Sequence, residues 1–99
     1  MGVRHVVLFR FTPETPADQP AAIARELRAL PAAIPEIVAY TAGADAGLNE
    51  GTWDFAVVAD FAGVADYMTY RDHPVHRQVI AEHIQPFVAE RAAAQIETD

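Results

Sequence analysis

The chain has 99 residues, of which 52% are hydrophobic and 21% charged, and this balance predicts one globular domain. Its formal net charge is −7, and its seven basic residues are all arginine and are not clustered. Nucleic acid and anionic membrane surfaces attract clustered basic residues, so we expect neither as a partner. The absence of cysteine excludes disulfides and thiolate ligands, and we expect a cytoplasmic protein.

Residues 5–11 (HVVLFRF) are β-branched and aromatic, which predicts a strand. Alternation along this strand gives two faces, one with Val3, His5, Val7, Phe9 and Phe11 and the other with Arg4, Val6, Leu8 and Arg10. Both faces are apolar in the middle, so both should be covered. We expect helices over the face that includes His5 and a different layer over the opposite face.

Three later segments are also predicted to be strands. Residues 37–43 and 53–61 have the composition of strands, and the glycine-rich stretch between them predicts a hairpin loop. Residues 91–97 predict the last strand, although their alanines favour a helix. Arg10 and Asp60 should lie on the same side of neighbouring strands, and we expect them to pair.

Helices are predicted between the strands. Isoleucine and leucine recur with the spacing of a buried helical stripe up to Leu30, where the first helix should end. A short helix is predicted over residues 64–70. The next helix should begin at Pro74, since proline is favoured in a first turn, and should run to about Ile84.

The elements follow the order strand, helix, strand, strand, helix, strand. This order predicts an α+β protein in which residues 1–99 form one ferredoxin-like βαββαβ subunit with an antiparallel sheet. One face of the sheet takes the helices, and the other is too apolar to face water. We therefore expect a homodimer in which the sheets of two copies pack together as a dimeric α/β barrel.

Residues 67–76 (YMTYRDHPVH) contain two tyrosines and two histidines. His76 shares an apolar helical stripe with Val79 and Ile80, so it should point inward. A buried, neutral imidazole can remove a proton α to a carbonyl near pH 7, which makes His76 the candidate base. Tyr70 could orient His76 or donate a proton to an enolate oxygen. The alternative for His76 is a core histidine that is satisfied by hydrogen bonds. The alternative for Tyr70 is an aromatic packing residue.

Two more histidines are candidates for the site. His5 could contact a substrate or hold His76, and the alternative is a structural role at the end of a barrel. His73 precedes proline, and for it we favour a role in capping the next helix. A zinc site could combine these histidines with Asp72, but Pro74 should turn the rings of His73 and His76 apart. We therefore expect no metal and no other cofactor.

Several short motifs occur in order along the chain. They are residues 5–9 (HVVLF), Leu30-Pro31, Ile34-Pro35, Gly43, residues 54–58 (DFAVV) and Tyr70-x-x-His73-Pro74-x-His76. In this order and spacing, nearly the whole chain resembles the stress-responsive dimeric α/β-barrel (Dabb) family. The resemblance implies a homodimer of ferredoxin-like subunits. Some plant relatives are polyketide cyclases, which close a poly-β-keto chain by aldol chemistry without a cofactor.

The resemblance also implies roles for individual residues. The catalytic pair of such cyclases resembles Tyr70 and His76, and the histidine of the first strand, here His5, lines the same pocket. Those cyclases have another histidine in the third strand, where this chain has Phe55. This departure from the pattern of those cyclases predicts a more apolar pocket in this chain.

An apolar cavity with a few polar groups is the usual form of a small-molecule site. Besides Tyr70 and His76, the pocket residues that we predict are His5, Val7, Phe9, Trp53, Phe55, Val57, Met68, His73, Val79 and Ile80. We expect a small apolar or polyketide-like ligand. Three functions fit such a pocket: a cofactor-independent enzyme of the polyketide cyclase type, a cofactor-free monooxygenase, and a stress-responsive or ligand-binding barrel without catalysis.

Overall fold

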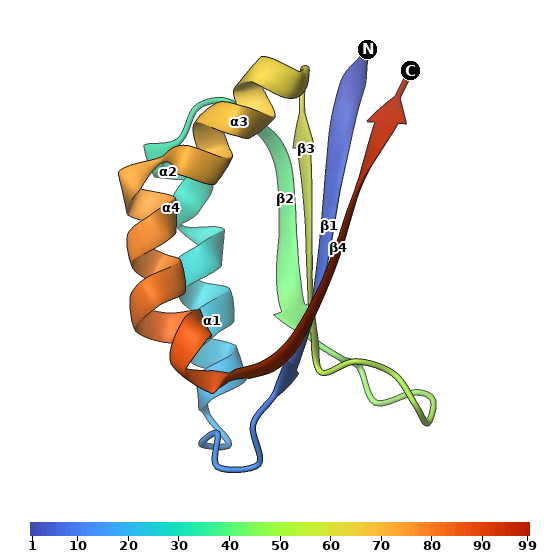
Figure 1. The fold of residues 1–99 in the computed structure, drawn as a ribbon, viewed down its shortest axis with the longest axis vertical. Coiled ribbons are helices and arrows are strands. Elements are labelled where there is room, and N and C mark those ends of the chain that lie inside the picture. Colours follow the sequence, from blue (N-terminus) through green and yellow to red (C-terminus); the bar gives the residue numbers. More distant parts are fainter.

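The computed structural model describes all 99 residues and places a layer of helices against one face of a single sheet (Figure 1). The strands are β1 (Gly2–Phe11), β2 (Ile37–Ala44), β3 (Phe55–Phe61) and β4 (Val88–Thr98). Their spatial order is β2-β3-β1-β4, and every neighbouring pair is antiparallel. This is the predicted ferredoxin-like α+β arrangement, in which the first and last strands of the chain lie side by side.

The helical layer has more breaks than the sequence predicted. It consists of α1 (Gln19–Arg28), α2 (Leu30–Ala33), α3 (Val64–Asp72), α4 (Pro74–Val79), a π-helical turn η1 (Ile80–Ile84) and a 3₁₀ turn η2 (Gln85–Phe87). The predicted connector after Leu30 is therefore partly helical. The predicted helix from Pro74 to Ile84 is α-helical only as far as Val79. Pro86 has no N–H to donate, which helps to end this helical run.

The buried core lies between the helices and one face of the sheet. On β1, Val3, His5, Val7 and Phe9 are all buried, as the alternation predicted. From the helical side, Ile23, Leu27 and Leu30 complete the same core. The predicted stripe of alternating residues and the predicted helical stripe therefore meet, and hydrophobic burial is the main contribution that joins the two layers.

The opposite face of the sheet has no helix over it (Figure 1). The strand registers place Val6, Leu8, Ala56, Val58, Ala92 and Ala94 together on this open face. These side chains are apolar, and Ile96 beside them is 54% exposed. The sequence predicted this apolar second face, and within one chain nothing covers it.

The predicted pair of Arg10 and Asp60 does not form. Asp60 lies opposite Arg4 in the β1–β3 register and accepts two hydrogen bonds from it, at 2.7 and 3.2 Å. Arg10 instead lies opposite Glu90, 3.4 Å away, and its guanidinium covers the ring of Trp53 at 4.1 Å. The prediction placed the two residues on the correct face but could not give the register between the strands.

The loop between β2 and β3 extends away from both layers (Figure 1). Gly47 and Gly51 have φ angles of 74° and 78°, a region that glycine adopts without a steric penalty. Strand β3 begins at Phe55 and not at residue 53. No helix of the protein combines the length and the apolar character needed to cross a bilayer.

Candidate functional site

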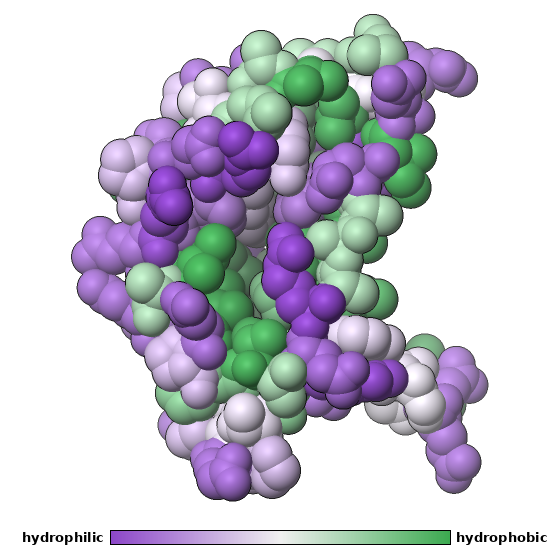
Figure 2. All heavy atoms as spheres, in the orientation of Figure 1, coloured by the Kyte–Doolittle hydropathy of each residue, from purple (hydrophilic) through white to green (hydrophobic).

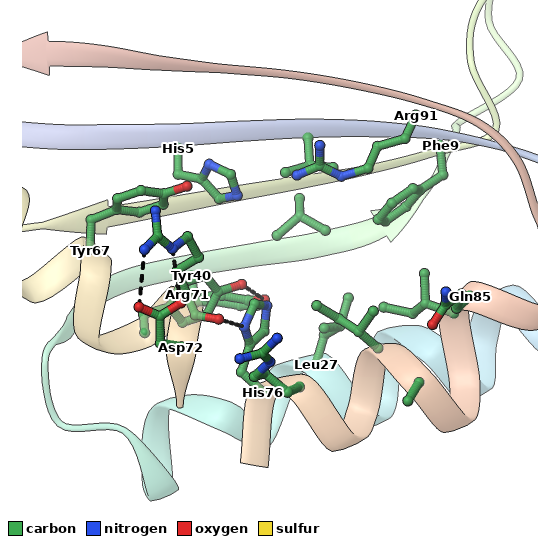
Figure 3. A pocket seen from close by; sticks show the side chains of 17 residues that line it. His5, Phe9, Leu27, Tyr40, Tyr67, Arg71, Asp72, His76, Gln85 and Arg91 are labelled. Atoms are coloured by element: carbon green, nitrogen blue, oxygen red, sulfur yellow. Dashed lines mark hydrogen bonds and ion pairs between the residues drawn. The ribbon is translucent and has the colours of Figure 1, made fainter. Parts of the chain in front are cut away.

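A cavity of about 650 Å³ lies between the helices and the sheet. Figure 2 shows the molecule hollowed between these two layers, and Figure 3 shows the side chains around the cavity. The lining residues are His5, Val7, Phe9, Leu27, Tyr40, Val57, Tyr67, Tyr70, Arg71, Asp72, His76, Arg77, Ile80, Ala81, Ile84, Gln85 and Arg91. The lining thus combines apolar side chains with two histidines and three tyrosines, the mixture that is typical of a small-molecule site.

His76 is held in place by the junction between α3 and α4. His73 is the N-cap residue of α4, and its Nδ1 accepts a hydrogen bond from the N–H of Val75 at 3.2 Å. Pro74 follows in the first turn, where its missing N–H has no cost. The helix that begins here brings His76, which is 8% exposed, to the cavity wall.

The hydrogen bonds of His76 define its tautomer. Nδ1 lies 3.1 Å from the carbonyl oxygen of Arg71, and a carbonyl can only accept, so Nδ1 carries the hydrogen. In the neutral ring, Nε2 then has the free lone pair. None of the hydrogen bonds of the protein involves Nε2, and no fully buried side-chain nitrogen lacks a partner, so Nε2 of this cavity-lining residue is accessible.

Burial lowers the pKa of His76 below its ordinary value of 6.5. The backbone carbonyls of Arg71 and Tyr70 act in the opposite direction, because they favour the protonated ring, but burial has the larger effect. His76 is therefore neutral at pH 7. A neutral imidazole with an accessible lone pair can accept a proton.

His5 presents the complementary atom. Its Nδ1 lies 2.8 Å from the amide nitrogen of Gln95, which donates, so Nδ1 is the acceptor and Nε2 carries the hydrogen. No protein group accepts a hydrogen bond from this Nε2–H. His5 is on the cavity wall, so its Nε2–H is a free donor there.

The pKa of His5 is lowered to about 4. Burial is the largest cause, and repulsion from the charge of Arg91 and from the protonated form of His76 adds to it. The ring therefore stays neutral across the physiological range, and it acts as a hydrogen-bond donor without a positive charge. One wall of the cavity thus has a proton acceptor, His76, and another has a neutral donor, His5.

Tyr70 contacts His76 through its ring. The two ring centroids are 4.0 Å apart and the planes are inclined by 30°. The Tyr70 hydroxyl is hydrogen-bonded to the hydroxyl of Tyr40 at 2.9 Å. Burial raises the pKa of Tyr70 to about 12 and raises that of Tyr40 further. Both phenols therefore remain protonated and can donate hydrogen bonds.

Residues 3–98 match the family model described as Stress responsive A/B Barrel Domain. The chain belongs to this family. The family resemblance that the motifs predicted is therefore confirmed. Among curated proteins, none matches this Dabb chain.

Solved structures similar to this Dabb protein share its fold. A dimeric ferredoxin-like protein of unknown function from Thermobifida fusca is 46% identical, with a TM-score of 0.91, over 99% of this chain and 92% of that chain. A dimeric protein of unknown function and ferredoxin-like fold from Bacteroides fragilis is 26% identical, with a TM-score of 0.83, over 98% of this chain and 96% of that chain. A hydroxynitrile lyase from Passiflora edulis is 20% identical, with a TM-score of 0.83, over 99% of this chain and 94% of that chain. At that identity the likeness to the lyase concerns the fold alone.

The structure brings most of the predicted pocket residues of this Dabb chain together. His5, Val7, Phe9, Val57, Tyr70, His76 and Ile80 all line the cavity. They come from β1, β3, α3, α4 and the π-helical turn η1, so the cavity joins both halves of the chain. His83, which follows His76, Val79 and Ile80 at the same helical spacing, does not line the cavity.

Trp53, Phe55, Met68, His73 and Val79 were predicted to line the pocket and do not. Phe55 is 1% exposed and its ring packs against the rings of Phe9 and Phe11. Its side chain is therefore part of the core. With Trp53 it lines a separate, smaller cavity. The idea that Phe55 sets the polarity of the main pocket is therefore corrected.

The other three residues have different surroundings. Met68 is 40% exposed, because α3 turns Tyr67 and Tyr70 toward the sheet in its place. Val79 is buried in the core behind the cavity wall. His73 caps α4, the role that the sequence favoured for it. No three histidine or acidic side chains lie together as a metal site.

Several lining residues were not predicted, of which Tyr40 and Arg91 matter most. Tyr40 faces the cavity because the pairing of β2 with β3 shifts between Ile37 and Ala39. Such an irregularity reverses which side chains of a strand face the core, and the sequence alone gives no simple sign of it. Arg91 lies opposite Phe9 in the β1–β4 register, and only this register shows that it is on the cavity side.

Proposed function

We propose that the protein is a cofactor-independent enzyme that removes a proton α to a carbonyl of a small molecule in the cavity. His76 is the base in this proposal. The observation that carries it is the pairing of two opposite tautomers on one cavity: the free lone pair of His76 and the free N–H of His5. An enolate-forming reaction needs a proton acceptor and a donor to the developing oxyanion.

The reaction begins with transfer of the α-proton to Nε2 of His76. The electrons of the broken C–H bond form an enolate, and the Nε2–H of His5 donates a hydrogen bond to its oxygen. In a poly-β-keto compound the enolate carbon then attacks a second carbonyl of the same molecule. The proton on His76 returns to the resulting alkoxide, so no redox partner and no cofactor is required. This is the aldol cyclisation of the polyketide cyclase type.

Tyr70 acts in this proposal mainly as a positioning residue. Its ring is stacked on His76, and its hydroxyl is engaged with Tyr40. The stacking and the hydrogen bond to Arg71 together restrict the imidazole, so that Nε2 keeps its direction. The cavity volume of about 650 Å³ is sufficient for a substrate of several fused or linked rings.

The test is deuterium exchange at a single acidic carbon. Ethyl 2-methyl-3-oxobutanoate is a neutral β-dicarbonyl compound with one proton on the carbon between its two carbonyls, and the loss of this proton signal in D₂O is followed by proton NMR. The wild-type protein should accelerate the exchange beyond the buffer rate, and His76→Ala should remove most of the acceleration. His83→Ala is the matched control, because His83 belongs to the same helical run but is outside the cavity lining. Equal rates in wild type and His76→Ala would reject His76 as the base, and a wild-type rate equal to buffer would favour a binding protein without catalysis.

We also propose that two copies pair through the open face of the sheet and form a dimeric α/β barrel. The apolar residues Val6, Leu8 and Val58 support this, since they occupy the centre of a face that no helix covers. The 46% identical protein from Thermobifida fusca is described as dimeric. Burying such a face between two sheets is the usual outcome for apolar sheet surfaces.

A further inference from the structure

The rim of the cavity has an excess of positive charge in an acidic protein. Of the four charged lining residues, Arg71, Arg77 and Arg91 are basic and only Asp72 is acidic. Asp72 is already engaged with Arg71 through two hydrogen bonds, each 3.0 Å long. The chain as a whole has a formal charge of −7, so this local balance is the opposite of the overall one.

Arg77 and Arg91 have no carboxylate partner. Arg4 and Arg10 form ion pairs with Asp60 and Glu90, and Arg28 donates to the carbonyl of Ala42. The guanidinium groups of Arg77 and Arg91 form neither an ion pair with a carboxylate nor a hydrogen bond with a carbonyl. Two of the arginines without partners therefore lie on one cavity.

Arg91 is the better placed of the two. It lies opposite Phe9 on β4, which is an edge strand of the sheet, and it lines the cavity. Figure 3 shows its side chain extending along the cavity, with the guanidinium directed toward His5. Its charge is close enough to affect the titration of both His5 and Tyr70. The guanidinium is thus adjacent to the proposed reaction site.

We propose that the cavity binds small organic carboxylates, with the carboxylate held by Arg91 and the apolar body of the ligand against Phe9, Val57 and Ile80. This inference rests on the proposed function, because it names the substrate class of the same cavity. A guanidinium presents two parallel N–H donors that match a carboxylate. The free N–H of His5 lies beside it as a further donor. Arg77 contributes positive potential at the rim, which attracts an anion.

Binding of matched probes tests the charge preference. The probes are 3-phenylpropanoate and its neutral amide, 3-phenylpropanamide, which have nearly the same shape, and affinities are measured by calorimetry. For the wild type we expect the carboxylate to bind about tenfold tighter than the amide, as charge-assisted hydrogen bonds allow. Arg91→Gln should abolish this ratio while the affinity for the amide is unchanged. Arg91→Lys, which keeps the charge without the paired donors, should retain part of it.

Arg25→Gln is the control variant, since Arg25 is exposed on α1, has no ion-pair partner and does not line the cavity. It should behave as the wild type. A second readout is the pKa of His5, which bound carboxylate should raise because it offsets the charge of Arg91. Equal affinities for the two probes, an unchanged ratio in Arg91→Gln, or no binding of the carboxylate at millimolar concentration would overturn the inference.

The two proposals for this cavity can fail separately. Deuterium exchange uses a neutral compound, so it reports on His76 whatever the preference for charge. Exchange that depends on His76, without a preference for the carboxylate, refutes only the substrate class. A preference for the carboxylate that depends on Arg91, without exchange, refutes only the catalytic role.

Discussion

The ring of Tyr70 stacks on the imidazole of His76, with centroids 4.0 Å apart and planes inclined by 30°. The hydroxyl of the same tyrosine is directed to Tyr40 and forms a hydrogen bond of 2.9 Å with it. The two parts of Tyr70 therefore have separate consequences. The ring restricts the orientation of His76, and the hydroxyl provides the hydrogen-bond partner of the Tyr40 hydroxyl.

Tyr70→Phe should keep the stack and lose the hydrogen bond. The hydroxyl of Tyr40 would then be buried without its partner, which costs about 1–3 kcal/mol of unfolding free energy. The measurement is urea denaturation. Because Tyr40→Phe removes the same bond, the double variant should be less destabilised than the sum of the two single variants. Tyr67→Phe is the control, and additive effects of the two changes would show that the bond is not a coupled pair.

The rate of His76-dependent exchange should depend on pH in one direction. Only the neutral ring accepts a proton, and the pKa of His76 is lowered from 6.5 by burial. The rate should therefore be constant above pH 7 and decrease on acidification, with a midpoint below 6.5. Exchange rates measured from pH 4 to 8, after subtraction of the buffer rate, give the profile. A midpoint above 6.5 would contradict the buried, neutral state of His76.

Folding stability should decrease on mild acidification because of His5. Its pKa is about 4 in the folded protein and near 6.5 when unfolded, so between these values the unfolded chain binds a proton that the folded chain does not. The contribution of His5 to the free energy of unfolding is fully present above pH 6.5. This contribution decreases as the pH falls toward 4, by up to about 3 kcal/mol. His76 adds to the effect in the same direction, since its pKa is also lowered.

Urea denaturation at intervals between pH 7 and pH 4 measures this loss. His5→Gln should reduce the slope of stability against pH in that range, because the variant lacks one of the two buried histidines. His83→Gln is the matched control, since His83 lies at the protein surface between Glu26 and Glu82. A slope that is unchanged in His5→Gln would show that His5 is not responsible.

Strand order and one face of β1 followed from the sequence because their pattern is regular. Alternation is unbroken from Val3 to Phe9, so it correctly predicted that His5 is buried beside the core. Strand β4 formed despite its alanines, because pairing with β1 outweighs their helical preference. The alternation within one segment was thus sufficient for β1, whereas β4 depends on its pairing with β1.

The predictions were less complete where contacts between distant segments decide which side chains meet. Met68 had the helical spacing of a buried residue, yet Tyr70 of the same helix takes the buried position. Tyr40 depends on an irregularity in the β2–β3 pairing, and Arg91 depends on the β1–β4 register. Neither the irregularity nor the register can be derived from the spacing of residues within one segment.

Val58→Glu should convert the proposed dimer into a monomer. Val58 pairs with Val6 on the open face of the sheet, where a charge would have to be buried against the second copy. Within one subunit this face is open, so the change should leave the fold intact. Sedimentation velocity at micromolar concentration should give about twice the chain mass for the wild type and the mass of one chain for the variant.

Val64→Glu is the control for this prediction. Val64 is 51% exposed at the start of α3, on the opposite layer of the molecule from the open face. It should leave the sedimentation of the protein unchanged, which excludes a general effect of added negative charge. A wild-type protein that sediments as a single chain would refute the pairing of the sheets. A Val58→Glu protein that remains a dimer would show that the copies associate through another surface, because a glutamate side chain at the centre of two packed sheets has neither water nor a cation to compensate its charge.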